Sequence, residues 1–121
     1  RLLVPDAIDH YLPWFAAFAF FDEVRDAGVE IWRYNEGFMH QKAVLIDDRL
    51  AAVGTANLDN RSFRLNFEAM AVVFDEGFAA EVETMLTADF ARSARLEARL
   101  EEQPLARRVG AVGARLLAPI L

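Results

Sequence analysis

The chain has 121 residues, of which 55% are apolar, and it carries a formal net charge of −6 without any cysteine. This length and apolar content predict one globular domain, and the lack of cysteine excludes disulfides, thiolate zinc sites and a cysteine nucleophile. Residues 1–91 carry a net charge of −9, and residues 92–121 carry +3. The acidic part argues against binding to nucleic acid, which depends on neutralising phosphates. The basic, apolar tail favours an anionic membrane surface.

The first third of the chain shows the pattern strand, helix, strand. Residues 2–4 form a short apolar run that ends at a proline. Asp9 is placed to cap a helix that runs to about Ala27, where Gly28 supplies a stop signal. Residues 29–34 then alternate as a strand does. This order predicts a parallel βαβ unit with a right-handed crossover, and therefore an α/β fold.

Two strands and a polar loop are expected in the middle of the chain. Residues 39–46 and 50–53 have the pattern of two strands, and the tight polar connection at residues 47–49 joins them into a hairpin. The following residues, 54–64, are polar and are expected to form a loop. The longest uninterrupted apolar run, residues 11–21, is too short to cross a membrane. The chain also lacks an initiator Met and a signal peptide, so we interpret it as a fragment of a larger protein.

A last strand, a helix and a tail complete the prediction. Residues 67–74 are apolar enough for a buried strand, and the acidic residues after it suit the start of a helix that runs to about Ala91. We expect the five strands to form one mixed sheet flanked by helices. The chain then divides into a domain at residues 1–91 and a helical tail at residues 92–121, which Pro104 interrupts. The tail either lies at a membrane surface or packs back on a protein surface.

His40 and Lys42 form the central candidate site. In an extended strand, residues two apart share a face, so an imidazole and an ammonium are expected side by side. Such a pair suits a phosphodiester, because Lys42 neutralises a non-bridging oxygen while His40 attacks phosphorus or protonates the leaving oxygen. Lys42 is also the only lysine among thirteen cationic side chains. A position that keeps the one compact ammonium is expected to need a point charge.

Five further residues surround this site. Gly54 allows a tight exit from the strand, and Thr55 and Asn57 offer a hydroxyl and an amide to a phosphate oxygen. Glu68 is the one acidic residue in an otherwise apolar strand, and we expect its carboxylate to hold a ring nitrogen of His40. Asp47 lies seven positions after His40, at the hairpin bend and with the opposite strand parity. We therefore assign Asp47 a structural role as a turn or ion-pair residue.

These residues resemble the signature of the phospholipase D superfamily. Its pattern is His-x-Lys-x4-Asp followed by Gly-Ser-x-Asn, and the sequence matches it from His40 to Asn57 except that Thr55 replaces Ser. The segment at residues 57–68, Asn-Leu-Asp-Asn-Arg-Ser-Phe-Arg-Leu-Asn-Phe-Glu, looks like the cardiolipin synthase version, as do both ends of the chain. The resemblance implies a phospholipase D-like α/β fold in which this chain is the C-terminal half of a two-motif enzyme.

Members of this family bring two such motifs together, and one histidine forms a phosphohistidine while the other protonates the leaving alcohol. By this resemblance His40 is the general acid or base, Lys42 and Asn57 hold phosphate, and Glu68 orients His40. The family needs no metal or other cofactor, and His10 is expected to be structural. The resemblance further implies a phospholipid substrate such as phosphatidylglycerol. It places the chain peripherally at the cytoplasmic face of the bacterial inner membrane.

Three functions remain open at this point. The first is phosphatidyl transfer with an absent N-terminal half, which gives cardiolipin and glycerol. The second is a single-motif nuclease that completes its site with a second copy, although the acidic composition weighs against it. The third is a folding or dimerisation module without turnover, because an isolated half exposes the surface that its partner covers.

Overall fold

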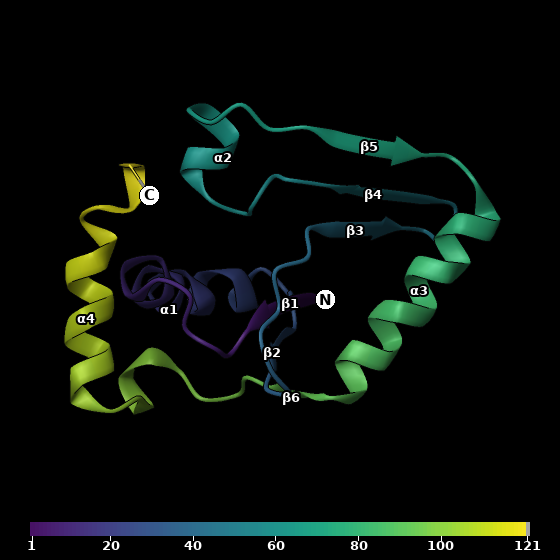
Figure 1. The fold of residues 1–121 in the computed structure, drawn as a ribbon. Coiled ribbons are helices and arrows are strands. Elements are labelled where there is room, and N and C mark those ends of the chain that lie inside the picture. Colours follow the sequence, from purple (N-terminus) through teal and green to yellow (C-terminus); the bar gives the residue numbers. More distant parts are fainter. Residues whose placement is uncertain (121) are drawn as a thin grey trace. The chain divides into compact units, whose positions relative to one another are not determined.

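The computed structural model describes residues 1–120, which form an α/β protein of two units, each with its own three-stranded sheet (Figure 1). The first unit combines residues 1–39 with the described residues from 93 onward, and the second is His40–Arg92. The expectation of one five-stranded sheet is therefore wrong. An apolar pattern identifies a strand, but it does not determine the neighbour with which that strand pairs.

The first unit confirms the parallel βαβ pattern. Strand β1 (Leu2–Pro5) pairs in parallel with β2 (Ile31–Tyr34), and helix α1 (Tyr11–Asp26) connects them. His10 occupies the N-cap position without a side-chain cap, so the expected capping role of Asp9 is wrong. Strand β6 (Ser93–Arg95) pairs antiparallel with β2. It was not predicted, because three residues are too few to show an alternating pattern.

The tail of the first unit is helical, as expected, and helix α4 (Leu105–Arg115) begins immediately after Pro104. Two short 3-10 helices flank it, η1 (Leu100–Glu102) and η2 (Ala118–Ile120). Helix α4 packs against α1. Residue 121, the end of the expected tail, lies outside the described residues. Within residues 1–120, no helix combines the length and apolar character that a bilayer crossing requires.

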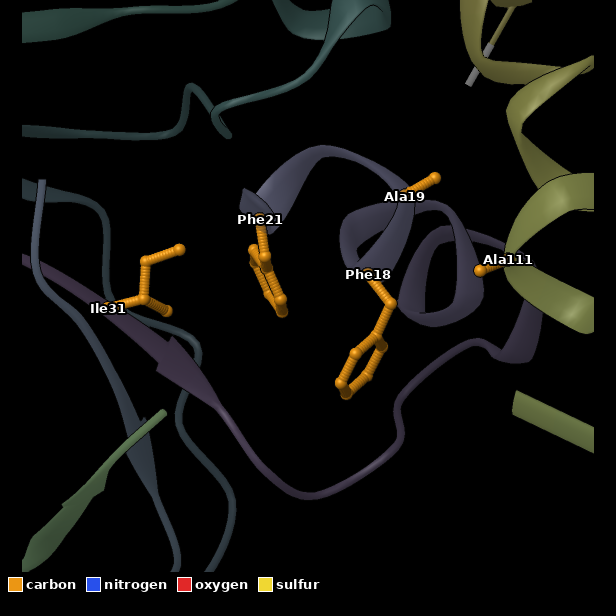
Figure 2. Close-up of a cluster of buried hydrophobic side chains, with 5 residues drawn as sticks. All are labelled: Phe18, Ala19, Phe21, Ile31 and Ala111. Carbon is orange, nitrogen blue, oxygen red and sulfur yellow. The ribbon is translucent and has the colours of Figure 1, made fainter. Parts of the chain in front are cut away.

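The core of the first unit lies between α1, β2 and α4. Figure 2 shows its five buried side chains, which are Phe18, Ala19, Phe21, Ile31 and Ala111. The rings of Phe18 and Phe21 meet edge to face with centroids 5.1 Å apart. Ile31 from β2 is 1% exposed, and Ala111 is fully buried. At the neighbouring Gly110, α4 approaches α1 so closely that only glycine fits, because a Cβ there would lie 2.6 Å from the Phe15 ring.

The second unit is an antiparallel sheet with a helix against it. Strands β3 (Ala43–Ile46) and β4 (Leu50–Gly54) form the predicted hairpin, and β5 (Met70–Val73) pairs with β4. Helix α3 (Glu76–Ala91) packs on β3 and β4. Asp75 caps its N-terminus by accepting a 2.7 Å hydrogen bond from the Phe78 amide.

Between β4 and β5, the expected loop contains a short helix, α2 (Asn60–Arg64). Its N-cap is Asp59, whose carboxylate accepts a 2.7 Å hydrogen bond from the Ser62 amide. The sequence carried this signal, because aspartate is among the preferred N-cap residues. The polar composition of the segment hid it, since a helix of five residues shows no apolar periodicity.

Candidate active site

The His40 to Lys42 segment precedes strand β3 instead of belonging to it. The strand begins at Ala43, four residues later than expected, although the Gly54 amide still donates to the Lys42 carbonyl at 3.1 Å. The strand-face argument therefore does not apply to His40 and Lys42. Their proximity rests on another contact, because the Lys42 ammonium donates a 2.8 Å hydrogen bond to the His40 backbone oxygen. His40 is exposed and Lys42 is half-buried.

Asp47 lies at the turn of the β3–β4 hairpin, away from the Lys42 end of the strand. Asp47 and Asp48 have φ angles of 49° and 54°, and the Arg49 amide donates to the Ile46 carbonyl at 3.2 Å. Two consecutive positive φ angles are typical of a hairpin turn, and aspartate tolerates this conformation better than most residues. Asp47 is exposed. Its position is that of the expected turn residue, and a buried ion pair is excluded.

Thr55 begins the loop that follows β4, and its backbone and hydroxyl are both bonded within the unit. The Thr55 amide donates to the Ala69 carbonyl at 3.0 Å, and the Thr55 hydroxyl accepts from the Ala69 amide at 3.0 Å. The same hydroxyl donates to Glu68 Oε2 at 2.5 Å. Gly54 is required before it, because a Cβ there would lie 2.1 Å from the Ala69 oxygen. In this structure the Thr55 hydroxyl therefore fixes the loop.

Glu68 is the centre of the hydrogen-bond network, and it lies just before β5. Its carboxylate accepts from Thr55 at 2.5 Å, from Ser62 at 3.1 Å and from Asn66 at 3.1 Å. These bonds hold the pKa of Glu68 below its usual range, with Thr55 contributing most, followed by Asn66 and then Ser62. The positive charge of Lys42 lowers the pKa of Glu68 further. The surroundings of Glu68 therefore favour its ionised carboxylate.

The expected hydrogen bond from Glu68 to a ring nitrogen of His40 is not among these contacts. Within residues 1–120, the hydrogen bonds of Glu68 come from Thr55, Ser62 and Asn66. The structure thus bonds Thr55 to Glu68, and it separately bonds Lys42 to the His40 backbone. An orienting role for Glu68 stays a prediction.

Ser62 and Asn66 belong to this network, and sequence reasoning missed both. Ser62 is 7% exposed, and its hydroxyl accepts from the Asn57 amide at 3.1 Å while it donates to Glu68. Asn57 is exposed at the end of the motif, so Ser62 fixes the backbone that carries it. Closeness in sequence could have identified them, because both residues lie within six positions of Glu68, on the connection that contains α2.

Comparison with known proteins identifies the family. The family described as cardiolipin synthase, PLD-like domain, matches residues 1–90. The chain belongs to this family. The cardiolipin synthase A of Pseudomonas aeruginosa (strain LESB58) is 54% identical over 124 residues, which cover 100% of this chain and 25% of that protein. The cardiolipin synthase A of Pseudomonas syringae pv. syringae (strain B728a) is 50% identical over 125 residues, with 100% and 26% coverage.

The chain therefore spans about a quarter of the length of these cardiolipin synthase relatives. Among solved structures, the crystal structure of phosphatidylserine synthase from Haemophilus influenzae Rd KW20 is similar, with a TM-score of 0.63. The two sequences are 20% identical, and the match covers 98% of this chain and 31% of that chain. At this identity the likeness shows the fold alone. The expected phospholipase D-like α/β fold and family membership are confirmed.

Proposed function

We propose that this chain supplies one of the two catalytic motifs of a phosphatidyltransferase of the cardiolipin synthase type. The observation that carries the proposal is the family match over residues 1–90, which includes the whole His-x-Lys-x4-Asp motif at His40, Lys42 and Asp47. The substrate is then a phospholipid, with phosphatidylglycerol as the donor. The second motif comes from another part of the same protein or from a second copy.

In the proposed reaction, one histidine attacks the phosphorus of phosphatidylglycerol, and the bond from phosphorus to the glycerol oxygen breaks. His40 donates the proton that the leaving glycerol needs. It then removes a proton from the hydroxyl of a second phosphatidylglycerol, whose oxygen attacks the phosphohistidine and gives cardiolipin. Lys42 neutralises charge on the non-bridging oxygens during both steps.

The polar network gives the other candidate residues supporting roles. Asn57 binds phosphate at the exposed end of its loop, and Thr55 and Glu68 hold that loop through their 2.5 Å hydrogen bond. Glu68 also orients His40 in the assembled site, in line with the sequence prediction. We place the reaction at the cytoplasmic face of the bacterial inner membrane, where the phospholipid lies.

The test is lipid turnover by the complete protein in mixed micelles. His40→Ala should abolish the formation of cardiolipin and glycerol from phosphatidylglycerol, because the site loses its proton donor, while the exposed position of His40 leaves the fold intact. General acid–base catalysis contributes on the order of 10²–10⁴ in rate. The matched control is His10→Ala, since His10 is the only other histidine and lies in the first unit. Full activity of His40→Ala would refute the proposal, as would activity on DNA but not on lipid.

A further inference from the structure

The segment 58–67, between the candidate site and β5, exposes its large apolar side chains to solvent. Its four large apolar side chains point outward: Leu58 is 74% exposed, Phe63 68%, Leu65 62% and Phe67 fully exposed. Three of its polar side chains bond within the unit: Asp59 caps α2, and Ser62 and Asn66 donate to Glu68. We call residues 58–67 the apolar segment. Figure 1 shows α2, its central part, in the connection between β4 and β5.

The apolar segment is held in a defined conformation. Asp59 caps α2, and the Leu65 and Asn66 amides both donate to the Arg61 carbonyl, at 2.9 and 2.8 Å. The Asn66 side chain donates to Glu68. A loop that exposed its apolar groups through disorder would lack these bonds. The apolar side chains are therefore presented by a bonded scaffold, which is expected of a surface that contacts an apolar partner.

The charge of this surface indicates the kind of partner. The apolar segment contains Arg61 and Arg64, both exposed, and one acidic residue, Asp59, whose carboxylate is occupied by the helix N-terminus. Arg61 keeps a weak 3.4 Å bond to Asn66. The surface is thus cationic and apolar, within a stretch of chain that is acidic overall. Aromatic and aliphatic side chains beside arginines suit an anionic phospholipid surface.

We propose that the apolar segment docks on an anionic phospholipid surface and brings the candidate site to the substrate headgroup. The inference rests on the proposed function for its substrate class. Phe63 and Phe67 enter the acyl boundary, and Arg61 and Arg64 pair with lipid phosphates. The segment joins the Asn57 loop directly to Glu68, so a headgroup bound by its arginines lies near the residues that would bind the reacting phosphate.

The experiment measures binding of the 121-residue chain to vesicles of phosphatidylglycerol or of phosphatidylcholine by co-sedimentation. The double variant Phe63→Ser, Phe67→Ser should bind phosphatidylglycerol vesicles at least about tenfold more weakly, because it lacks the two aromatic side chains that the bilayer would bury. Arg64→Gln should lose about fivefold, the effect of one basic group near an anionic surface, and only on phosphatidylglycerol. The matched control is Phe74→Ser, which removes an 81% exposed phenylalanine beyond the far end of β5.

Equal binding by the Phe63→Ser, Phe67→Ser variant and the parent chain would overturn the proposal. So would a loss of the same size in Phe74→Ser. Sedimentation equilibrium covers the case of a second copy: if the double variant dissociates a dimer and leaves vesicle binding unchanged, the surface is an interface between copies and the proposal fails. Arg64→Gln keeps the test valid if the double variant misfolds. Because binding requires no turnover, failure of the proposed reaction leaves this result interpretable.

Discussion

Two phenylalanines of the first unit and three of the second have opposite surroundings. In the first unit, Phe18 and Phe21 are 4% and 8% exposed and form the core with Ile31. In the second unit, Phe63, Phe67 and Phe74 lie on the surface. The same residue type therefore stabilises the first unit by burial at two positions and leaves three exposed apolar groups on the second. The comparison teaches that apolar composition alone does not locate a core.

The second unit is ordered around its candidate site by polar contacts. Ser62 is buried there, and Glu68 collects three hydrogen bonds. The buried apolar residues of this unit are small, and they are Ala51, Ala52, Ala79 and Val82. Since the candidate site is surrounded by hydrogen bonds and not by a large core, substitutions in it should affect activity more than stability. Substitutions in the core of the first unit should do the reverse.

The largest effect is expected from Lys42→Arg, measured as cardiolipin formation by the complete protein. The charge is kept, but a planar guanidinium replaces the compact ammonium that bonds the His40 carbonyl at 2.8 Å. We expect a loss of turnover on the order of 10², comparable to removal of one positioned donor. The thermal midpoint should change little, because Lys42 is only half-buried.

The control for Lys42→Arg is the reverse exchange, Arg49→Lys, in the exposed turn of the same hairpin. It should leave both turnover and melting unchanged. If Lys42→Arg retains full activity, net charge is sufficient at this position, and the argument from geometry is wrong. If it unfolds the chain, the proposed separation between site and core is wrong.

The next effect is on stability instead of turnover, and it is expected from Ile31→Ala in the first unit. Ile31 is 1% exposed within the aromatic core, and truncation of such a residue costs about 2–5 kcal/mol. Urea unfolding followed by far-UV circular dichroism measures the free energy of unfolding, because both units contain helix and strand. Phe74→Ala, the matched change in the second unit, should cost within about 0.5 kcal/mol because Phe74 is exposed. Equal losses would remove the difference between the units.

The sequence predicted the elements of this fold better than their assembly. The parallel pair β1 and β2 and the β3–β4 hairpin were both predictable, because turn residues and local apolar runs define them. The division into two sheets was not, because it depends on pairing between distant segments. Strand β6 and helix α2 were missed because three and five residues are too short to show a period.

The candidate site shows the same limit. Spacing alone identified His40, Lys42, Asp47, Thr55 and Asn57, because the motif lies along one local stretch of chain. The partners of Glu68 could not be read from spacing. As the one acidic residue in an apolar run, Glu68 was expected within a strand, whereas it precedes β5 and bonds Thr55, Ser62 and Asn66. Contacts of this kind depend on how a connection folds, which residue types do not reveal.

The smallest expected effect is the pH dependence of the network around Glu68. Hydrogen bonds from Thr55, Asn66 and Ser62 hold the pKa of Glu68 below its usual value of ~4.3, so the folded state favours the carboxylate. A group with a lowered folded pKa contributes stability above its unfolded pKa and loses it as the pH falls through the folded pKa. Glu68→Gln should therefore weaken the network near neutral pH. Its difference from the parent chain should shrink only below pH ~4.3.

Hydrogen exchange at two backbone amides gives the local measurement, because the Thr55 amide bonds the Ala69 carbonyl and the Ala69 amide bonds the Thr55 hydroxyl. Their protection factors, corrected for intrinsic exchange, should fall in Glu68→Gln at neutral pH and converge with those of the parent chain in acid. Glu83→Gln, at an exposed position of α3, is the control and should change neither amide. A difference that grows as the pH falls would mean that folding favours the protonated acid. The carboxylate could not then be the group that fixes the Thr55 loop. The conclusion that hydrogen bonds to Glu68 order the second unit around its candidate site would be wrong.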